Sequence, residues 1–240
     1  MSRNKFSMEK KITLIKSFIC LGYVGVPLAT CILFFYSPRS WGHIVFLIFM
    51  IFHSFERVWE TFYTTKEKKA YELHGDWTLA VVTAAYLLLC FITVAECYIK
   101  VQKFNPVVTV IGFVFYILAF RIRWWGMRSL GKQWAIHAVG VQKIEKIRLI
   151  KIGAFKYIRH PIYLSIMMEV VSIPILANAF WSTLFAIAVN VPLQYMRLVI
   201  EERTSMRRFG DEYVKYKQET DRLVPIKYFK RKIFPQNVSR

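Results

Sequence analysis

The sequence predicts an all-α integral membrane protein with about six transmembrane helices, and its composition and charge give the reason. Of its 240 residues, 55% are hydrophobic and only 20% are charged. Thirty-four Lys and Arg against fifteen Asp and Glu give a formal net charge of +19. Apolar runs that alternate with basic links are typical of a multi-pass membrane protein. Because the basic residues lie between these runs and not on a polar domain, we expect no nucleic-acid partner.

Six apolar stretches are the candidate transmembrane helices, since a span needs roughly twenty apolar residues. They cover residues 12–36, 41–55, 77–99, 106–120, 161–180 and 181–200. The second and fourth are short, at about fifteen residues, and could be extended slightly into their flanks. The first stretch is followed by no small-residue cleavage site, which favours a retained span over a signal peptide. Turn residues at 37–40, and the lack of a linker around 178–181, predict two helical hairpins.

The distribution of Lys and Arg predicts the orientation of these helices. Thirty of the 34 fall in four segments that alternate along the chain: the N-terminus to Lys11, the links 56–76 and 121–160, and the tail from Arg197. Basic residues are enriched in cytoplasmic loops of membrane proteins. The sequence therefore predicts a multi-pass protein with both termini cytoplasmic. The prokaryotic cytoplasmic membrane is favoured, with the endoplasmic reticulum as the alternative if the source is eukaryotic.

Several familiar kinds of site are missing from the sequence. The four cysteines lie in or at the ends of apolar runs without CxxC spacing, so we expect them to be small hydrophobic core residues. The five histidines lack metal-ligand spacing, and we predict no metal site; His43 and His53 more simply satisfy local polar groups. None of the ten glycines falls in a GxGxxG or P-loop pattern, which argues against those nucleotide sites.

Two acidic residues lie within predicted helices, where ionisable groups are candidates for function. Glu96 is close to the outer end of its helix and is expected to reach water. Glu169 lies about two turns into the fifth helix and should face the interior of the bundle. We interpret Glu169 as a structural or supporting residue ahead of a catalytic one.

Residues 153–163, GAFKYIRHPIY, form the most distinctive local pattern. Pro161 suits the first position of a helix, because its fixed φ and missing N–H carry no penalty there. The following N–H groups then have no partner within the helix, and such a helix start binds anions. Arg159 and His160 add cationic or donor groups beside it. An ordinary basic turn at the membrane surface would have the same residues.

A second pattern lies on the helix that leaves the last apolar stretch. Arg197 and Glu201 are four residues apart and so share one helix face. They could simply pair with each other. Alternatively, Glu201 binds an ammonium group while Arg197 binds a carboxylate or phosphate through its planar fork. A ligand that carries both an amine and a carboxylate could then bridge Glu201 and the helix start at Pro161.

These patterns together resemble the isoprenylcysteine carboxyl methyltransferase family, to which phospholipid N-methyltransferases of the PEMT type are distantly related. The resemblance covers about residues 121–225. It rests on LGKQW at 130–134, GAFKYIRHPIYL at 153–164 and RLVIEERTSMRRFGDEYVKYKQETDRLVP at 197–225. The ordered set is far more specific than any one piece. The first two predicted helices have no clear counterpart in the family.

The resemblance implies a membrane methyltransferase that uses S-adenosyl-L-methionine (SAM) at a cytoplasmic-side site built by the C-terminal half. It implies Arg197 as the contact to the substrate carboxylate. The cofactor contacts implied are Leu149, Ile150, Phe155, His160, Pro161, Ile162, Tyr163 and Glu201. Phe155 stands where the family usually has Tyr, so one hydroxyl is missing. The expected organisation is residues 1–120 as N-terminal transmembrane helices, 121–226 as the methyltransferase core and 227–240 as a basic tail.

The favoured reaction is methyl transfer to the carboxylate of a lipophilic, prenylcysteine-like acceptor that enters from the bilayer. A carboxylate is already ionised at neutral pH, so orientation and removal of water suffice. An amine or phenol acceptor would need a base, for which Glu169, Glu202 and Tyr213 are candidates.

Three alternatives remain open. One is a phospholipid N-methyltransferase or small-phenol O-methyltransferase on the same scaffold. Another is an NADPH-dependent sterol-type reductase, although those enzymes tend to carry an RHxNY turn, whereas Pro161 is followed here by Ile162 and Tyr163. The third is a non-enzymatic protein that binds anionic lipid through its tail from Lys227 to Arg240. For that tail we favour a solvated end.

Overall fold

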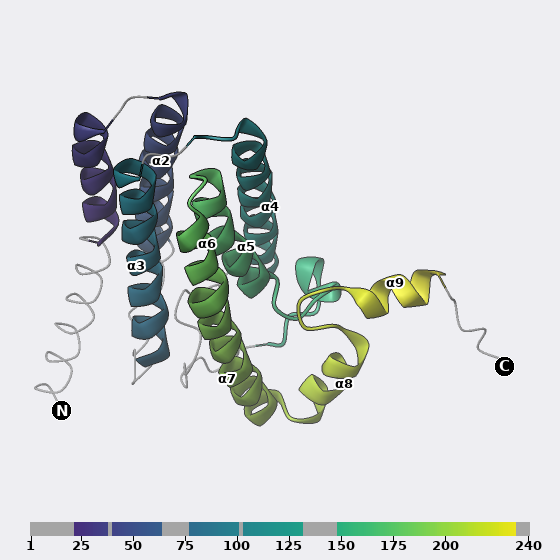
Figure 1. Cartoon of the computed structure of the whole chain (residues 1–240). Helices are drawn as coiled ribbons and strands as arrows, with labels where there is room; N and C mark the ends of the chain where they lie inside the picture. Colours follow the sequence, from purple (N-terminus) through teal and green to yellow (C-terminus); the bar gives the residue numbers. More distant parts are fainter. Residues whose placement is uncertain (1–21, 38–39, 64–76, 101–102, 132–147, 234–240) are drawn as a thin grey trace, which may run out of the picture.

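The computed structural model describes residues 22–37, 40–63, 77–100, 103–131 and 148–233. Within these ranges the chain is helical, and strand-like pairing is limited to a bridge between Ile158 and Asp221. The long helices pack side by side in a bundle, and the shorter C-terminal helices lie at and beyond one end of it (Figure 1). The predicted all-α membrane fold is therefore confirmed. Residues 12–21 of the first predicted span lie outside the described residues, as do 132–147.

The helices follow the predicted apolar stretches. They are Gly22–Tyr36, α2 (Trp41–Tyr63), α3 (Trp77–Ile99), α4 (Pro106–Leu130), the 3₁₀ turn η2 (Gly153–Lys156), α5 (Pro161–Leu176), α6 (Phe180–Phe185), the π-helical turn η3 (Ala186–Asn190), α7 (Val191–Phe209), α8 (Asp211–Glu219) and α9 (Ile226–Ile233). The segments Trp41–Glu60, Trp77–Ile99, Pro106–Leu130 and Phe180–Phe209 are long and apolar enough to cross a membrane; Gly22–Tyr36 and α5 are shorter apolar helices.

The second and fourth helices are much longer than predicted. The apolar runs stop at about residues 55 and 120, but α2 continues to Tyr63 and α4 to Leu130. Placing Glu56 and Arg121 at the starts of links was therefore wrong. The continuation is possible because the inward-facing charged residues of these extra turns pair with one another, since unpaired charges inside the bundle would be costly. They are Glu56, Arg57, Glu60 and Arg123.

An ionic cluster joins α2, α4 and α5 through these residues. Arg123 of α4 pairs through Nη2 with Glu169 of α5, and its Nη1 lies 3.5 Å from Glu60 and 3.7 Å from Glu56. Arg57 pairs with Glu56 at 2.5 Å and with Glu60 at 2.6 Å. None of the five side chains is more than 12% exposed. The prediction that Glu169 faces the interior is confirmed, and its Arg123 partner supports the structural interpretation.

Hydrogen bonds extend this cluster to α3. The Tyr86 hydroxyl donates to Glu169 at 2.7 Å and lies 2.6 Å from His53 Nε2. The other ring nitrogen of His53 lies 2.7 Å from the Tyr116 hydroxyl. His43 is satisfied in the same local way, with the carbonyl of Cys97 3.0 Å from its Nε2. The interpretation of both histidines as local polar partners is confirmed.

The sequence suggested that Glu96 reaches water, but in the structure its carboxylate is bound to the start of α6. Its carboxylate accepts hydrogen bonds from the backbone N–H of Trp181 at 3.1 Å and of Ser182 at 2.8 Å, and from the Ser182 hydroxyl at 2.7 Å. It therefore caps the first turn of α6, where N–H groups lack partners within the helix. This contact fastens the end of α3 to the start of the last long helix.

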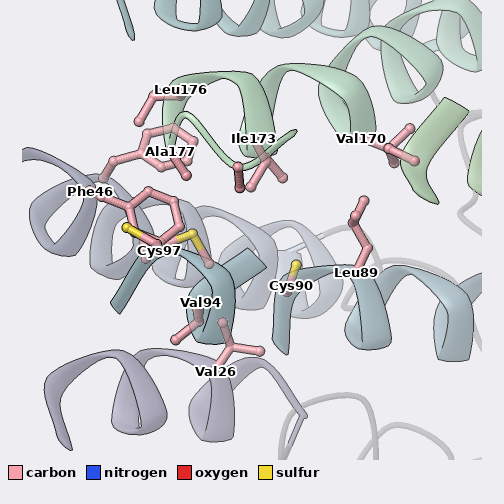
Figure 2. Close-up of a cluster of buried hydrophobic side chains, with 14 of the residues drawn as sticks. Val26, Phe46, Leu89, Cys90, Val94, Cys97, Val170, Ile173, Leu176 and Ala177 are labelled. Carbon is pink, nitrogen blue, oxygen red and sulfur yellow. The ribbon is translucent and has the colours of Figure 1, made fainter. Parts of the chain in front are cut away.

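The apolar core lies between α2, α3 and α5 (Figure 2). Cys90 and Cys97 are buried in it, which confirms the cysteines of α3 as core residues. At Gly112 the backbone of α4 passes directly over the end of α5. A Cβ at Gly112 would lie 2.5 Å from the backbone nitrogen of Leu176, so only glycine permits this approach.

The two ends of the bundle differ in what they carry. The helices end or begin at Tyr36, Trp41, Ile99, Pro106, Leu176 and Phe180 at one end, and these connections are short (Figure 1). The opposite end carries η2, α8 and α9 (Figure 1). The first residues of the predicted tail are helical, because α9 covers Ile226–Ile233; the solvated end stays a prediction. Residues 234–240 lie outside the described residues.

The ionic cluster generates a stability prediction. We expect Arg123→Met to destabilise the protein by about 3–5 kcal/mol, because it leaves the buried Glu169 carboxylate without its closest cation. Adding Glu169→Gln should recover part of this loss, since the amide oxygen still accepts from Tyr86 and the unpaired charge is gone. Thermal unfolding of the detergent-solubilised variants measures both effects.

Arg121→Met is the matched control, because Arg121 is exposed on the same helix and its replacement should change stability by less than about 0.5 kcal/mol. Equal stability of the single and double variants would show that the two side chains do not depend on each other.

Candidate active site

The approach to α5 is packed tightly against the end of α4. Gly153 begins η2 with φ of +60°, and a Cβ at this position would overlap the hydroxyl of Ser129. The same hydroxyl accepts a hydrogen bond from the backbone N–H of Ala154 at 3.1 Å. A residue with a side chain would be strained at this positive φ and would collide with Ser129. These two constraints explain why the sequence has glycine at the start of this motif.

The helix α5 starts where the sequence predicted. Pro161 occupies its first turn and His160 is the residue before the helix. The His160 side chain makes no capping hydrogen bond to the helix, so the first N–H groups, those of Ile162 and Tyr163, are not capped from that position. The start of α5 therefore retains the donor groups and the positive dipole end that bind an anion.

A short segment after α8 lies alongside the residues that lead into α5. The backbone N–H of Arg159 donates to the carbonyl of Asp221 at 2.8 Å, and that of His160 donates to the carbonyl of Arg222 at 3.1 Å. These bonds fix the backbone just before Pro161. The segment Asp221–Arg222 is thus part of the candidate site; it lies in the stretch 197–225 that carries the resemblance, but the sequence analysis gave these two residues no role.

Glu202 is the centre of the contacts that hold this arrangement together. Its Oε1 accepts from Arg159 Nε at 3.0 Å and lies 3.2 Å from His160 Nε2. Its Oε2 accepts from Arg222 Nη2 at 2.6 Å. The Glu202 side chain is only 3% exposed. Arg159 also donates to the carbonyls of Lys217 and Thr220.

These contacts change the interpretation of three residues. The side chains of Arg159 and His160 were expected to add cationic or donor groups beside the start of α5, but both are turned towards Glu202. Glu202 was a candidate base, but its two oxygens are held by three basic side chains. The sequence could have shown that Glu202 has a different environment from Glu201, because adjacent residues of a helix point about 100° apart.

Glu201 and Tyr163 form the second contact across the site. The Tyr163 hydroxyl, in the first turn of α5, donates to Glu201 Oε2 at 2.7 Å. Glu201 is half-buried and Tyr163 is buried. One turn before Glu201, the buried Arg197 donates from Nη1 to the Thr78 hydroxyl at 3.2 Å, at the start of α3. The structure thus brings Tyr163, Glu201 and Arg197 together from α5 and α7.

The remaining predicted cofactor contacts lie before α5. Leu149 and Ile150 are half-buried residues that lead into η2, and Phe155 lies within η2. The Phe155 carbonyl accepts from the Tyr216 hydroxyl at 2.7 Å, so α8 holds this segment. Their roles as cofactor contacts stay predictions. The motif residues 132–134 lie outside the described residues.

Tyr213 is a poor candidate for a catalytic base. It is buried in α8, and this burial raises the pKa of its hydroxyl well above the ordinary value. A tyrosine acts as a base only after losing its proton, which becomes harder as its pKa rises. Tyr213 therefore stays protonated at neutral pH. Glu169, the other candidate base, is engaged by Arg123 and Tyr86.

The inner face of the last long helix is polar over more turns than the sequence analysis recognised. Asn190, Gln194 and Arg197 are all buried, and with Glu201 they follow a spacing of four, three and four residues. Asn190 ends the π-helical turn η3, and its Nδ2 has no hydrogen-bond partner within the described part of the chain. Hydropathy averaged along the sequence does not show this polar face, because apolar residues on the other faces of the helix dominate the average.

We expect Glu202→Gln to loosen the segment after α8, because a neutral amide cannot hold Arg159 and Arg222 as a carboxylate does. Trypsin should then cleave after Arg222 several times faster, as followed by mass spectrometry of the released fragment. Glu212→Gln is the matched control, since Glu212 forms an exposed pair with Lys151 and such pairs contribute little. Equal cleavage rates in the two variants would contradict the role assigned to Glu202.

Parts of this chain are similar to a known family and to known proteins. The isoprenylcysteine carboxyl methyltransferase (ICMT) family matches residues 110–207. Methanethiol S-methyltransferase 1 of Bradyrhizobium diazoefficiens is 37% identical over 71 residues, which is 30% of this chain and 24% of that protein. The uncharacterized protein YpbQ of Bacillus subtilis is 30% identical over 94 residues, 39% of this chain and 54% of that protein. The chain thus spans about a quarter of the length of the first of these curated relatives and about half of the length of the second. The part of the chain that is similar to the isoprenylcysteine carboxyl methyltransferase family, residues 110–207, contains Pro161, Tyr163, Arg197 and Glu201.

Proposed function

We propose that this protein is a membrane methyltransferase that transfers a methyl group from SAM to a lipophilic acceptor, favoured as the carboxylate of a prenylcysteine-like molecule. The observation that carries the proposal is the contact between Tyr163 and Glu201 at 2.7 Å. This contact sets an acidic side chain beside a helix start with uncapped N–H groups. One cation-binding and one anion-binding group therefore lie together at the same place.

The residues present fit the amino-acid portion of SAM. An ammonium group would be bound by Glu201, and a carboxylate would be bound by the first N–H groups of α5. Pro161 contributes by fixing the backbone at the start of that helix, and His160 contributes through the Glu202 contact that holds the turn. Leu149, Ile150 and Phe155 would line the remainder of the site, as the family resemblance implies.

The chemistry supplied by bound SAM is an electrophilic methyl group on a sulfonium. Arg197 would orient the acceptor carboxylate, and its hydrogen bond to Thr78 holds its guanidinium on the inner side of α7. The carboxylate needs no base, which agrees with the engaged state of Glu169 and Glu202. The apolar helices around the site would exclude water from the acceptor, which strengthens the orienting interaction.

A second candidate acceptor is a thiol or phenol. One specific observation favours it: a relative is named methanethiol S-methyltransferase. A neutral thiol must lose its proton before it attacks, so this reaction would depend on pH. The base would be the bulk solvent or a residue beyond the groups discussed above. The NADPH-dependent reductase alternative finds no support in the comparisons.

The membrane arrangement belongs to the same proposal. We propose that both termini are cytoplasmic and that the acceptor enters the site laterally from the bilayer. The end of the bundle that carries η2, α8 and α9 would face the cytoplasm, because most of the basic residues belong to this end. SAM would then bind from the aqueous side.

Variants of Glu201 and Arg197 separate the proposed cofactor contact from the proposed acceptor contact. We expect Glu201→Gln to weaken SAM binding about 10- to 100-fold, since a hydrogen bond to a charged group contributes about 1.5–3 kcal/mol. Arg197→Ala should keep SAM binding within a few fold but abolish turnover. Binding is measured by calorimetry on the detergent-purified protein, with Glu212→Gln as the control. Unchanged SAM affinity in Glu201→Gln would refute the assignment of this residue.

The second prediction identifies the acceptor chemistry. With methyl-labelled SAM and a farnesylcysteine analogue, we expect label that base releases as methanol, because only methyl esters hydrolyse in this way. The rate should be nearly constant between about pH 6 and 8, since a carboxylate of pKa near 4 is ionised throughout. A thiol or phenol acceptor would instead give base-stable label and a rate that rises about tenfold per pH unit.

A further inference from the structure

The C-terminal helix α9 has an uncovered apolar face. Ile226, Phe229 and Ile233 follow a spacing of three and four residues, so they share one face. Their exposed fractions are 53%, 53% and 65%. Lys230 and Lys232 lie exposed beside this face. A short helix with apolar residues on one side and lysines beside them is typical of segments that lie in the membrane surface.

The contacts of α9 set the direction in which this face points. Tyr228 packs against the ring of Tyr157 at 4.7 Å between centroids, so this side of the helix is turned to the protein. Lys227 donates from its backbone N–H to the Asp221 carboxylate at 2.5 Å and from Nζ to the Lys217 carbonyl at 3.0 Å. These bonds fix the first turn of α9 to the end of α8. The apolar face is therefore held outward and cannot fold back.

The height of α9 relative to the bundle follows from its aromatic neighbours. Tyr157 packs on Trp125 at 5.5 Å, near the C-terminal end of α4. Trp125 is 46% exposed, its neighbour Trp124 is 38% exposed, and the guanidinium of Arg128 lies 4.8 Å from the Trp124 ring. Exposed tryptophans beside a basic residue at a helix end mark the boundary between acyl chains and headgroups. The helix α9 is attached at this level.

The direction of α9 agrees with this level. It projects sideways from the bundle and runs across the direction of the long helices (Figure 1). A helix perpendicular to the spanning helices lies in the plane of the membrane. At this height its apolar face can reach the acyl boundary while the lysines reach the phosphates.

We propose that α9 is an interfacial helix that binds the surface of the surrounding bilayer, with Ile226, Phe229 and Ile233 in the acyl boundary and Lys230 and Lys232 on anionic phospholipid headgroups. The occupant of the uncovered face is thus the lipid of the same membrane. Apolar burial and electrostatic attraction to anionic lipid act together in such helices.

This docking has a consequence for the site, which rests on the proposed function. Asp221 accepts from the first turn of α9, and its carbonyl accepts from the Arg159 N–H. The next residue, Arg222, binds Glu202 and the backbone of His160. A docked α9 therefore holds the segment that fixes the start of α5. We infer that anionic lipid raises the affinity of the site for SAM.

A fluorescent probe tests the docking without any assay of activity. The full chain carries NBD on a cysteine introduced as Phe229→Cys, in a background with Cys20→Ser and Cys31→Ser, and is placed in lipid nanodiscs. We expect stronger, blue-shifted emission in discs that contain phosphatidylglycerol than in discs of phosphatidylcholine alone. Spin-labelled lipid should quench this emission. The control probe at Lys215→Cys, exposed on α8, should respond to neither.

Three results would overturn the docking. One is probe emission typical of water in both lipids. Another is equal emission after Lys230→Gln and Lys232→Gln, which should lower the signal in anionic discs. The third is emission that appears only when two copies share a disc, because a second copy of the chain would then cover the face.

SAM affinity in the same discs tests the consequence for the site. We expect tighter binding in phosphatidylglycerol discs, and loss of this difference in a Phe229→Ser, Ile233→Ser variant. Docking without any lipid effect on SAM binding would refute the coupling alone. Absence of SAM binding under all conditions would refute the proposed function but leave the docking result in place.

Discussion

The pairing of Arg123 with Glu169 is the interaction on which the arrangement of the helices depends. A charge in the interior of an apolar bundle is tolerated only where a partner meets it. Arg123 comes from α4 and Glu169 from α5, while Glu56, Arg57 and Glu60 of α2 complete the cluster. Sliding or rotating any of these helices would separate charges on buried side chains. The cluster therefore fixes α5 along its length, and the start of α5 is where the candidate site lies.

The adjacent residues Glu201 and Glu202 make different contacts at the candidate site. Glu202 is nearly inaccessible and binds Arg159, His160 and Arg222, so it joins three segments of the chain. Glu201 points about 100° away around the helix, is half-buried, and contacts Tyr163. One carboxylate joins segments of the protein, and under the proposed function the other binds the ligand. The pair of acids would then supply both rigidity and a binding group.

The sequence predicted the helical membrane fold, the start of α5 and the shared face of Arg197 and Glu201, because each depends on local pattern. It did not predict the ends of α2 and α4, since hydropathy averages over a helix and cannot show that Arg57 and Arg123 face inward. Nor did it predict that Glu96 caps α6 or that Glu202 binds Arg222. Those contacts join residues 20 to 86 positions apart, and spacing rules apply only within one helix. The alternation of basic segments remains a prediction of orientation.

The family match covers only residues 110–207, and this range bears on which residues would select the methyl acceptor. The match ends at residue 207 and begins at 110, so it contains the start of α5 and Glu201. Thr78, which holds Arg197, lies before it, and Arg222, which binds Glu202, lies after it. The groups proposed to bind SAM thus lie within the matched range, whereas Thr78, which contacts Arg197, lies on a helix outside it. If Arg197 orients the acceptor as proposed, part of the acceptor site comes from α3, which the family match does not include. On this proposal, a chain that is similar to the family over residues 110–207 can act on an acceptor that its relatives do not use.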